Sequence, residues 1–289
     1  MSLPGLAAFL GWAFVAEVIG TMAGFGAATV LTPIAGWFFD IKIAVAVVAC
    51  FHLFGNASRL WFFGRFIDWR SFRRFGVAAI LLSFAGAQAV ASMPAFAVRL
   101  LLGGFLIVYA GLELAGAMQI RVPATTGTMV AGGMVSGLIA GLIGTGGAIR
   151  SLCLLAFGFP KEVYLGTSAA IALLVDATRL PVYLTQGFIP ASLIPVIGTL
   201  TVVAFCGAWL GRRLVQRIPA GRFKQFMSVM LLLMGVKLVI DGLREATKRR
   251  DTIPISLRLT MGNRYRVPDF VATDSPDYYR TAQGGACRH

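Results

Sequence analysis

Long apolar runs occupy nearly all of the first 243 residues, and no other feature of the sequence constrains the fold as strongly. The hydrocarbon core of a membrane is about 30 Å thick, so a helix that spans it needs about 20 apolar residues. Runs of this length or longer cover residues 6–38, 41–63, 72–92, 96–118, 125–159, 162–184, 189–211 and 225–243. The sequence therefore predicts an all-α polytopic membrane protein.

The charge of the chain agrees with this interpretation and argues against two others. The formal net charge is +14, yet only 13% of the residues are charged and 57% are hydrophobic. An ordinary soluble domain is about 25% charged, so neither a soluble enzyme nor a nucleic-acid-binding protein with a solvated basic face is expected. Excess basic residues of a polytopic protein gather in its cytoplasmic loops. We therefore expect a multi-pass protein that contacts membrane lipid and does not bind nucleic acid.

The composition changes at about residue 243. Residues 1–243 hold 17 basic and seven acidic residues and form the predicted membrane transport domain. Residues 244–289 hold nine basic and five acidic residues, three prolines and no sustained apolar period. This composition predicts a polar, flexible tail. The N-terminus has no basic segment, so a cleaved signal peptide is not expected.

Two of the apolar runs, 6–38 and 125–159, are far too long for one span, and glycine interrupts both. The residues at the two interruptions are Gly24, Gly26, Gly144, Thr145, Gly146 and Gly147. A helix break leaves backbone groups unpaired, and a membrane tolerates it only where it is buried in protein or lines a cavity. Each long run is therefore predicted to form two half-helices that meet inside the membrane.

A repeat of 120 residues relates the two halves of the chain. Adding 120 to a residue number takes the first glycine pair to the second, Asn56 to Asp176 and Arg59 to Arg179. Each half then holds one broken run followed by three ordinary spans. Repeats of this kind are typical of secondary transporters, whose substrate site lies at the broken helices.

Loop charges indicate that the halves, at about residues 6–118 and 125–243, are inverted. The loop after the second run holds four arginines, and its counterpart at 186–190 holds no basic residue. The connection after the third run holds one arginine, and its counterpart at 212–224 holds five basic residues. Inverted repeats produce this exchange if each broken run is re-entrant. The predicted fold is two inverted repeats, each with a re-entrant segment and three transmembrane helices, and parallel repeats are the alternative.

Charged side chains inside a membrane domain are costly and point to a functional site. Asp176 lies one helical turn before Arg179, and Asn56 has the same spacing to Arg59. Arginine binds anions through its planar fork, and helix N-termini present free N–H groups. The predicted substrate-binding residues are Gly24, Gly26, Asn56, Arg59, Gly144, Thr145, Gly146, Gly147, Asp176 and Arg179. Snorkelling of the arginines and close helix packing at the glycines are the alternatives.

The other polar residues form no catalytic constellation. The four cysteines have no CxxC spacing and His52 stands alone on an apolar stretch, so packing is the role expected for them. Arg150 is expected to face the same cavity or a lipid headgroup. Glu17, Glu113 and Lys237 lack a repeat partner and are interpreted as packing pairs or proton-coupling groups. We expect no enzyme activity, no metal and no other cofactor.

Several motifs resemble the sulfite exporter TauE/SafE family, also called the toluene-sulfonate uptake permease family. These motifs are Gly24-Phe25-Gly26 before Thr32-Pro33, the loop at 64–70, the stretch at 137–147 before Phe159-Pro160, and the stretch at 166–169. The likeness covers about residues 6–243. Ala27 and Ala28 depart from the family, whose first cluster is often richer in glycine.

The resemblance implies a permease or exporter of sulfite or organosulfonates in a bacterial inner membrane. A small anion held at two helix N-termini and by intramembrane arginines agrees with this implication, and alternating access is the expected mechanism. Small carboxylates would fit the same donors, and an anion channel is the other alternative. The sequence leaves open whether the protein is a homo-oligomer.

Overall fold

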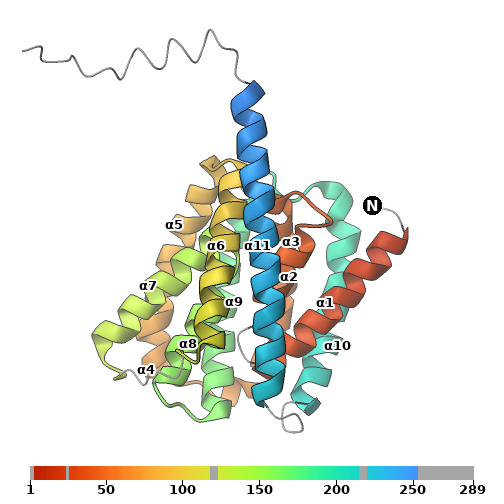
Figure 1. Ribbon diagram of the computed structural model, residues 1–289. Coiled ribbons are helices and arrows are strands. Elements are labelled where there is room, and N and C mark those ends of the chain that lie inside the picture. Colours follow the sequence, from red (N-terminus) through yellow and green to blue (C-terminus); the bar gives the residue numbers. More distant parts are fainter. Residues whose placement is uncertain (1–2, 24–25, 118–122, 215–219, 253–289) are drawn as a thin grey trace, which may run out of the picture. The chain divides into compact units, whose positions relative to one another are not determined.

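The fold is helical throughout the part of the chain that a computed structural model describes, residues 3–23, 26–117, 123–214 and 220–252, and these residues form no strand. Seven helices among them are long and apolar enough to cross a membrane. The longer helices are α1 (Leu3–Ala23), α3 (Ile41–Phe63), α5 (Val77–Ser92), α6 (Ala95–Leu114), α7 (Thr126–Ile143), α9 (Lys161–Thr185), α10 (Ile194–Leu214) and α11 (Ala220–Thr252) (Figure 1). The shorter elements are α2 (Ala28–Ala35), η1 (Gly64–Phe66), α4 (Trp69–Ser71), η2 (Phe72–Gly76), α8 (Gly146–Ala156) and η3 (Ala191–Leu193).

The chain divides into two units. Met1–Ala246 form one compact unit that contains every residue of the site described below, and Thr247–His289 form the second. The predicted flexible tail belongs mostly to residues 253–289, which lie outside the described residues.

Each of the two long apolar runs is divided into a long and a short helix. Helix α1 ends at Ala23 and α2 begins at Ala28, whereas α7 ends at Ile143 and α8 begins at Gly146. In Figure 1, α1 runs downwards from the labelled N-terminus, and α7 runs upwards from the lower left.

Backbone geometry explains why glycine stands at both breaks. Gly26 has a φ of 88° and Gly144 has a φ of 80°, in the left-handed region that costs other residues about 1–2 kcal/mol. Gly144 ends α7, and its N–H donates a hydrogen bond of 3.0 Å to Ala140 O. A Cβ at Gly26 would also overlap the imidazole of His52. The break near Gly26 therefore needs glycine both for its conformation and for its close approach to α3.

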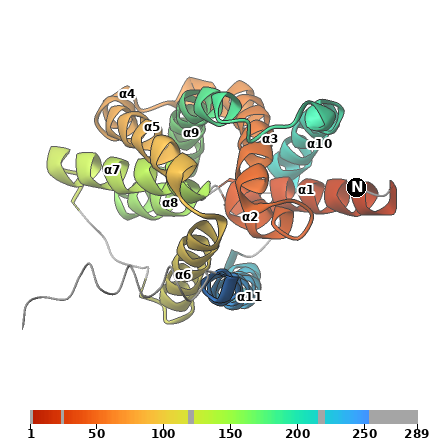
Figure 2. The same cartoon turned by 90° about the horizontal axis from the view of Figure 1, so that it is seen from above.

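Small residues let the halves of the chain pack closely against one another. Helix α7 packs on α5, α1 packs on α10, and α3 packs on α9, as Figure 2 shows from above. On α7, Gly133, Gly137 and Gly141 follow one another at four-residue spacing. A Cβ at any of them would overlap a backbone carbonyl oxygen of the facing segment, at Phe75, Ala79 and Ser83 respectively. These glycines form a small-residue ridge of the kind that lets membrane helices touch backbone to backbone.

Candidate functional site

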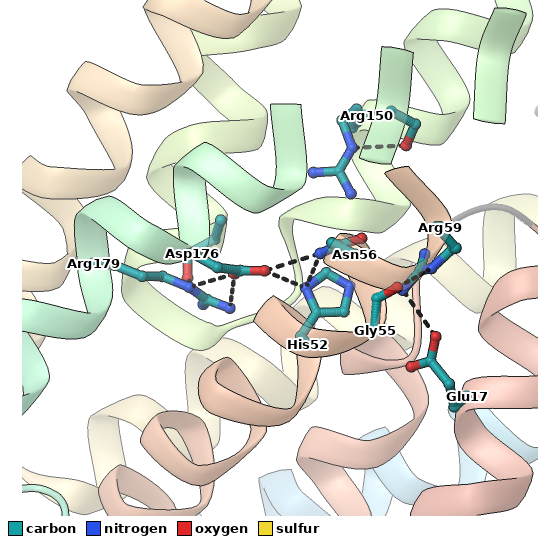
Figure 3. Close-up of polar contacts among 10 residues, drawn as sticks. Glu17, His52, Gly55, Asn56, Arg59, Arg150, Asp176 and Arg179 are labelled. Carbon is teal, nitrogen blue, oxygen red and sulfur yellow. Dashed lines mark hydrogen bonds and ion pairs between the residues drawn. The ribbon is translucent and has the colours of Figure 1, made fainter. Parts of the chain in front are cut away.

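The centre of the Met1–Ala246 unit holds a cluster of buried polar side chains where α3 crosses α9. His52, Asn56 and Arg59 lie on α3 at spacings of four and three, so they share one face of the helix. Asp176 and Arg179 lie on α9, one turn apart. All five side chains are at most 3% exposed, although four of the five are charged or ionisable. Figure 3 shows them meeting between the two helices.

Asp176 is the hub of this cluster. Its Oδ2 accepts a hydrogen bond of 3.0 Å from Asn56 Nδ2 and lies 2.7 Å from His52 Nδ1. Its Oδ1 accepts bonds from Arg179, from Nε at 3.0 Å and from Nη2 at 2.7 Å. Because both oxygens are engaged, the carboxylate is an organiser of the site and has little capacity left for a ligand.

Arg179 also uses its donors for hydrogen bonds within the protein. Its Nη1 donates a hydrogen bond of 2.5 Å to Ala140 O, near the end of α7. The hydroxyl of Tyr183, one turn further along α9, donates to Gly141 O at 2.6 Å. Tyr183 therefore satisfies a carbonyl group that the break would otherwise leave unpaired, whereas Arg179 adds a second donor to the Ala140 carbonyl, which already accepts from the Gly144 N–H. Snorkelling is wrong for this arginine, which is 1% exposed.

Arg59 has looser contacts than its repeat counterpart. Its Nε donates to Gly55 O at 3.3 Å, and its Nη2 lies 3.2 Å from Glu17 Oε1 on α1 without hydrogen-bond geometry. Glu17 is completely buried, and its Oε1 accepts a bond of 3.1 Å from the Thr21 hydroxyl. Arg59 is 3% exposed, so snorkelling is wrong for this arginine too, and it retains donor capacity for a ligand.

Arg150 on α8 supplies the third buried guanidinium. Its Nε donates a bond of 2.9 Å to Ser168 Oγ, whereas its Nη2 has no hydrogen-bond partner among the described residues. The side chain is 2% exposed, and Figure 3 shows it directed toward Asn56. Arg150 faces the interior cluster and not a lipid headgroup, which decides between the two interpretations of the sequence.

Eight buried side-chain polar atoms of the described residues, including those of Arg59 and Arg150, have no hydrogen-bond partner. Within the described residues they are Glu17 Oε2, Thr29 Oγ1, Thr32 Oγ1, His52 Nε2, Asn56 Oδ1, Arg59 Nη2, Thr145 Oγ1 and Arg150 Nη2. Most buried polar groups in proteins find a partner, so a gathering of unpaired groups marks a place for water or a ligand. Thr32 of α2 and Arg179 of α9 both approach Gly144, which links the two breaks at this place.

The cluster carries an excess of positive charge. Arg59, Arg150 and Arg179 face the two carboxylates of Glu17 and Asp176, which leaves one positive charge uncompensated when His52 is neutral. A buried charge without a partner costs several kcal/mol, roughly, even after relaxation. An anion in the cluster would remove that cost.

The structure brings together most of the residues that the sequence predicts for the site. Gly26, Asn56, Arg59, Gly144, Thr145, Asp176 and Arg179 lie at the breaks or in the cluster. Gly146 and Gly147 are buried in the first turn of α8, where Gly146 O accepts a bond of 2.9 Å from Ser136. A Cβ on Gly146 would overlap the α7 backbone, so packing accounts for this glycine. Gly24 lies outside the described residues.

For two residues of the cluster, the sequence alone does not predict the role that the structure indicates. The sequence predicts only a packing role for His52, yet its Nδ1 lies 2.7 Å from Asp176 Oδ2. Its spacing of four to Asn56 and seven to Arg59 is the signal that places it on the same helical face. Arg150 has no repeat counterpart, because position 30 is a valine, so the repeat does not identify it as a site residue.

The helices and the buried cluster together define a multi-pass membrane protein with a charged site in its interior. The family model described as sulfite exporter TauE/SafE matches residues 9–238, and the chain belongs to this family. The family is one of transporters and not of enzymes, which agrees with the expectation from the sequence. No curated protein matched the chain in a sequence search.

Proposed function

We propose that the protein is a secondary transporter of a small oxyanion, either sulfite or an organosulfonate, in a bacterial inner membrane. The family is described by sulfite export, and the cluster offers a buried site with one excess positive charge. The residues proposed to hold the anion are Arg59, Arg150 and Thr145, with Asn56, Asp176 and Arg179 positioning them.

The observation that carries this proposal is the unpaired Nη2 of Arg150. A guanidinium that is 2% exposed and keeps one nitrogen without a hydrogen bond is strongly destabilising in an empty site. Unpaired donors are also present on Arg59 and Thr145. An oxyanion has several acceptor oxygens, so it can accept from all three donors at once.

The N-terminus of α8 adds to the attraction. Thr145 is the N-cap of α8, and the first N–H groups of this helix carry partial positive charge. Helix N-termini bind anions in many proteins, and the broken helices of transporters place them at mid-membrane.

We propose that the two halves are inverted repeats with re-entrant broken segments. The opposite directions of α1 and α7 in Figure 1 support this arrangement, as does the reciprocal packing of α1 on α10 and of α7 on α5. Arg65 and Arg212 line one cavity of about 1240 Å³, although they come from different halves. Under the positive-inside rule this basic cavity faces the cytoplasm.

The place where the two halves meet supports alternating access as the transport mechanism. The contact of Asn56 with Asp176 joins α3 of the first half to α9 of the second, next to the unpaired donors. A rocking of one half against the other would open the site to one side of the membrane and then to the other.

The experiment is uptake of radiolabelled sulfite and of a sulfonate into proteoliposomes. Arg150→Gln is expected to lower uptake about 30-fold or more, because a charged hydrogen bond is lost at the site. Arg99→Gln is the matched control, since Arg99 pairs with Asp40 and Glu245 away from the cluster. Unchanged uptake by Arg150→Gln would contradict the proposal.

The same assay separates the alternatives. Uptake that saturates with substrate concentration and shows exchange with internal substrate indicates a carrier, whereas a linear dependence without exchange indicates a channel. Competition by small carboxylates as strong as that by sulfonates would widen the substrate class to carboxylates.

A further inference from the structure

Glu17 is a buried carboxylate at the edge of the cluster, and anion binding does not require it. It is completely buried on α1. Its Oε1 accepts from Thr21 at 3.1 Å and lies 3.2 Å from Arg59 Nη2. Its Oε2 has no hydrogen-bond partner among the described residues. The Glu17 carboxylate therefore holds Arg59, which retains donor capacity for a ligand. Glu17 Oε2 itself can still accept a hydrogen bond or a proton.

Small residues on two other helices enclose this side chain. A Cβ at Gly55 of α3 would lie 2.6 Å from Glu17 Oε2, and a Cβ at Gly207 of α10 would lie 2.8 Å from Glu17 Cβ. The space around the carboxylate thus depends on glycine at both positions. The side chain is held at a fixed place between α3 and α10, and larger residues there would displace it.

Few ionisable side chains surround Glu17 on the helices that pack against it. Arg59 of α3 faces it, with His52 two turns earlier on the same helix. The side of α10 that contacts it presents Gly207, and α2 has no ionisable side chain in its sequence. A change in the charge of Glu17 therefore acts most strongly on Arg59.

We propose that Glu17 is a proton-binding site, and that its protonation releases Arg59 to bind the anion. This inference rests on the proposed function. A proton from the aqueous phase binds the open Oε2, the carboxylate becomes a neutral carboxylic acid, and its ion pair with Arg59 is lost. Arg59 Nη2 then donates to an oxygen of the anion instead.

Charge counting shows why the two ligands assist one another. The cluster has one excess positive charge while Glu17 is ionised, and protonation raises the excess to two. Anion binding is stronger in the second state, and by reciprocity a bound anion favours the proton. The transporter then moves a proton and an anion together in the same direction.

The proton site belongs to one half of the chain. The position 120 residues after Glu17 is Gly137, which packs against the Ala79 carbonyl on α5. Helix α7 therefore has no equivalent carboxylate. Coupling to one proton per transport cycle follows from this asymmetry.

The test measures binding of methanesulfonate to the purified protein as a function of pH, together with proton uptake. The charge of this sulfonate stays constant over the range in which carboxylates and histidines titrate, so any proton must bind to the protein. For the wild type, the dissociation constant is expected to fall about tenfold for each pH unit of acidification, with one proton taken up per anion. Glu17→Gln resembles the protonated state, so it is expected to bind without proton uptake and with little pH dependence.

Two further variants keep the test decisive. Glu113→Gln removes a carboxylate of α6 and is expected to keep the wild-type pH dependence. If His52→Gln loses the dependence while Glu17→Gln keeps it, the proton binds His52 and the inference is overturned. Wild-type binding that does not vary with pH also overturns the inference and leaves the proposed function standing. Absence of any anion binding would instead remove the proposed function itself.

Discussion

Asn56 Nδ2 donates a hydrogen bond of 3.0 Å to Asp176 Oδ2, and the two residues are separated by 120 positions. They occupy equivalent places in the two halves of the sequence, on α3 and on α9. Equivalent residues can touch one another only where the equivalent helices cross. The bond therefore marks the place where the halves meet, and any movement of one half against the other must change its surroundings.

Asp176→Asn should destabilise the protein strongly. The substitution leaves Arg179 buried without its carboxylate and removes an acceptor of Asn56 and His52. Breaking a buried ion pair on one side costs about 3–5 kcal/mol. Chemical unfolding in detergent measures this loss. Asp241→Asn is the control, since its pair with Lys237 is exposed and should contribute about 1 kcal/mol or less. Equal losses for the two variants would argue against the hub role of Asp176.

Gly26→Ala and Gly144→Ala should differ in severity. Both positions have positive φ, so each alanine costs about 1–2 kcal/mol. At Gly144 the nearest atoms to a Cβ lie 3.4–3.6 Å away, whereas at Gly26 the Cβ would overlap His52. We expect Gly144→Ala to lower the unfolding temperature modestly and Gly26→Ala to abolish transport as well. Uptake and thermal unfolding of both variants check the difference, and an equally active Gly26→Ala would contradict it.

Gly137→Ala should weaken the packing of α7 on α5. The added methyl group overlaps the Ala79 carbonyl, so the helices must separate, and overpacking of this kind costs about 1–3 kcal/mol. Gly111→Ala on α6 is a suitable control because a Cβ there meets nothing within 4 Å. Unfolding of the two variants under the same conditions gives the comparison. A stability of Gly137→Ala equal to that of Gly111→Ala would show that the glycine ridge does not set the helix spacing.

Cysteine labelling should report the inverted arrangement. In a variant without native cysteines, Arg70→Cys and Arg212→Cys are expected to react with a membrane-impermeant maleimide from one side only. Ser92→Cys and Gln186→Cys are expected to react from the opposite side. Each pair takes one exposed position from each half. Parallel halves would instead place Arg70 and Arg212 on opposite sides.

The spans and the breaks could be predicted because they depend on local properties of the sequence. Hydropathy locates the spans, and an apolar run of 33 residues is longer than one span needs and contains Gly24 and Gly26, at which a helix can break. The spacing of three between Asp176 and Arg179 likewise predicts their ion pair, whose nitrogen and oxygen are 2.7 Å apart.

The partners that arrive from distant segments could not be predicted in this way. His52 meets a carboxylate 124 residues away, and Arg179 meets a carbonyl oxygen 39 residues away. No periodicity of a single helix contains these contacts, because they depend on how α3, α7 and α9 pack. Among the polar residues, the repeat identifies only those that are polar in both halves, and it therefore misses Glu17, whose counterpart is Gly137, and Arg150, whose counterpart is Val30.

The contact of Arg179 with the end of α7 has an electrostatic consequence for the second break, between α7 and α8. A broken helix normally presents a donor end that attracts an anion and a carbonyl end that repels it. Here Arg179 and Tyr183 bind the carbonyls of Ala140 and Gly141, so the repulsive end is screened. Arg59 instead directs its Nε to Gly55 on its own helix. The two repeat-related arginines therefore act differently, and at the second break an anion meets the attraction of the α8 N-terminus with little opposing repulsion.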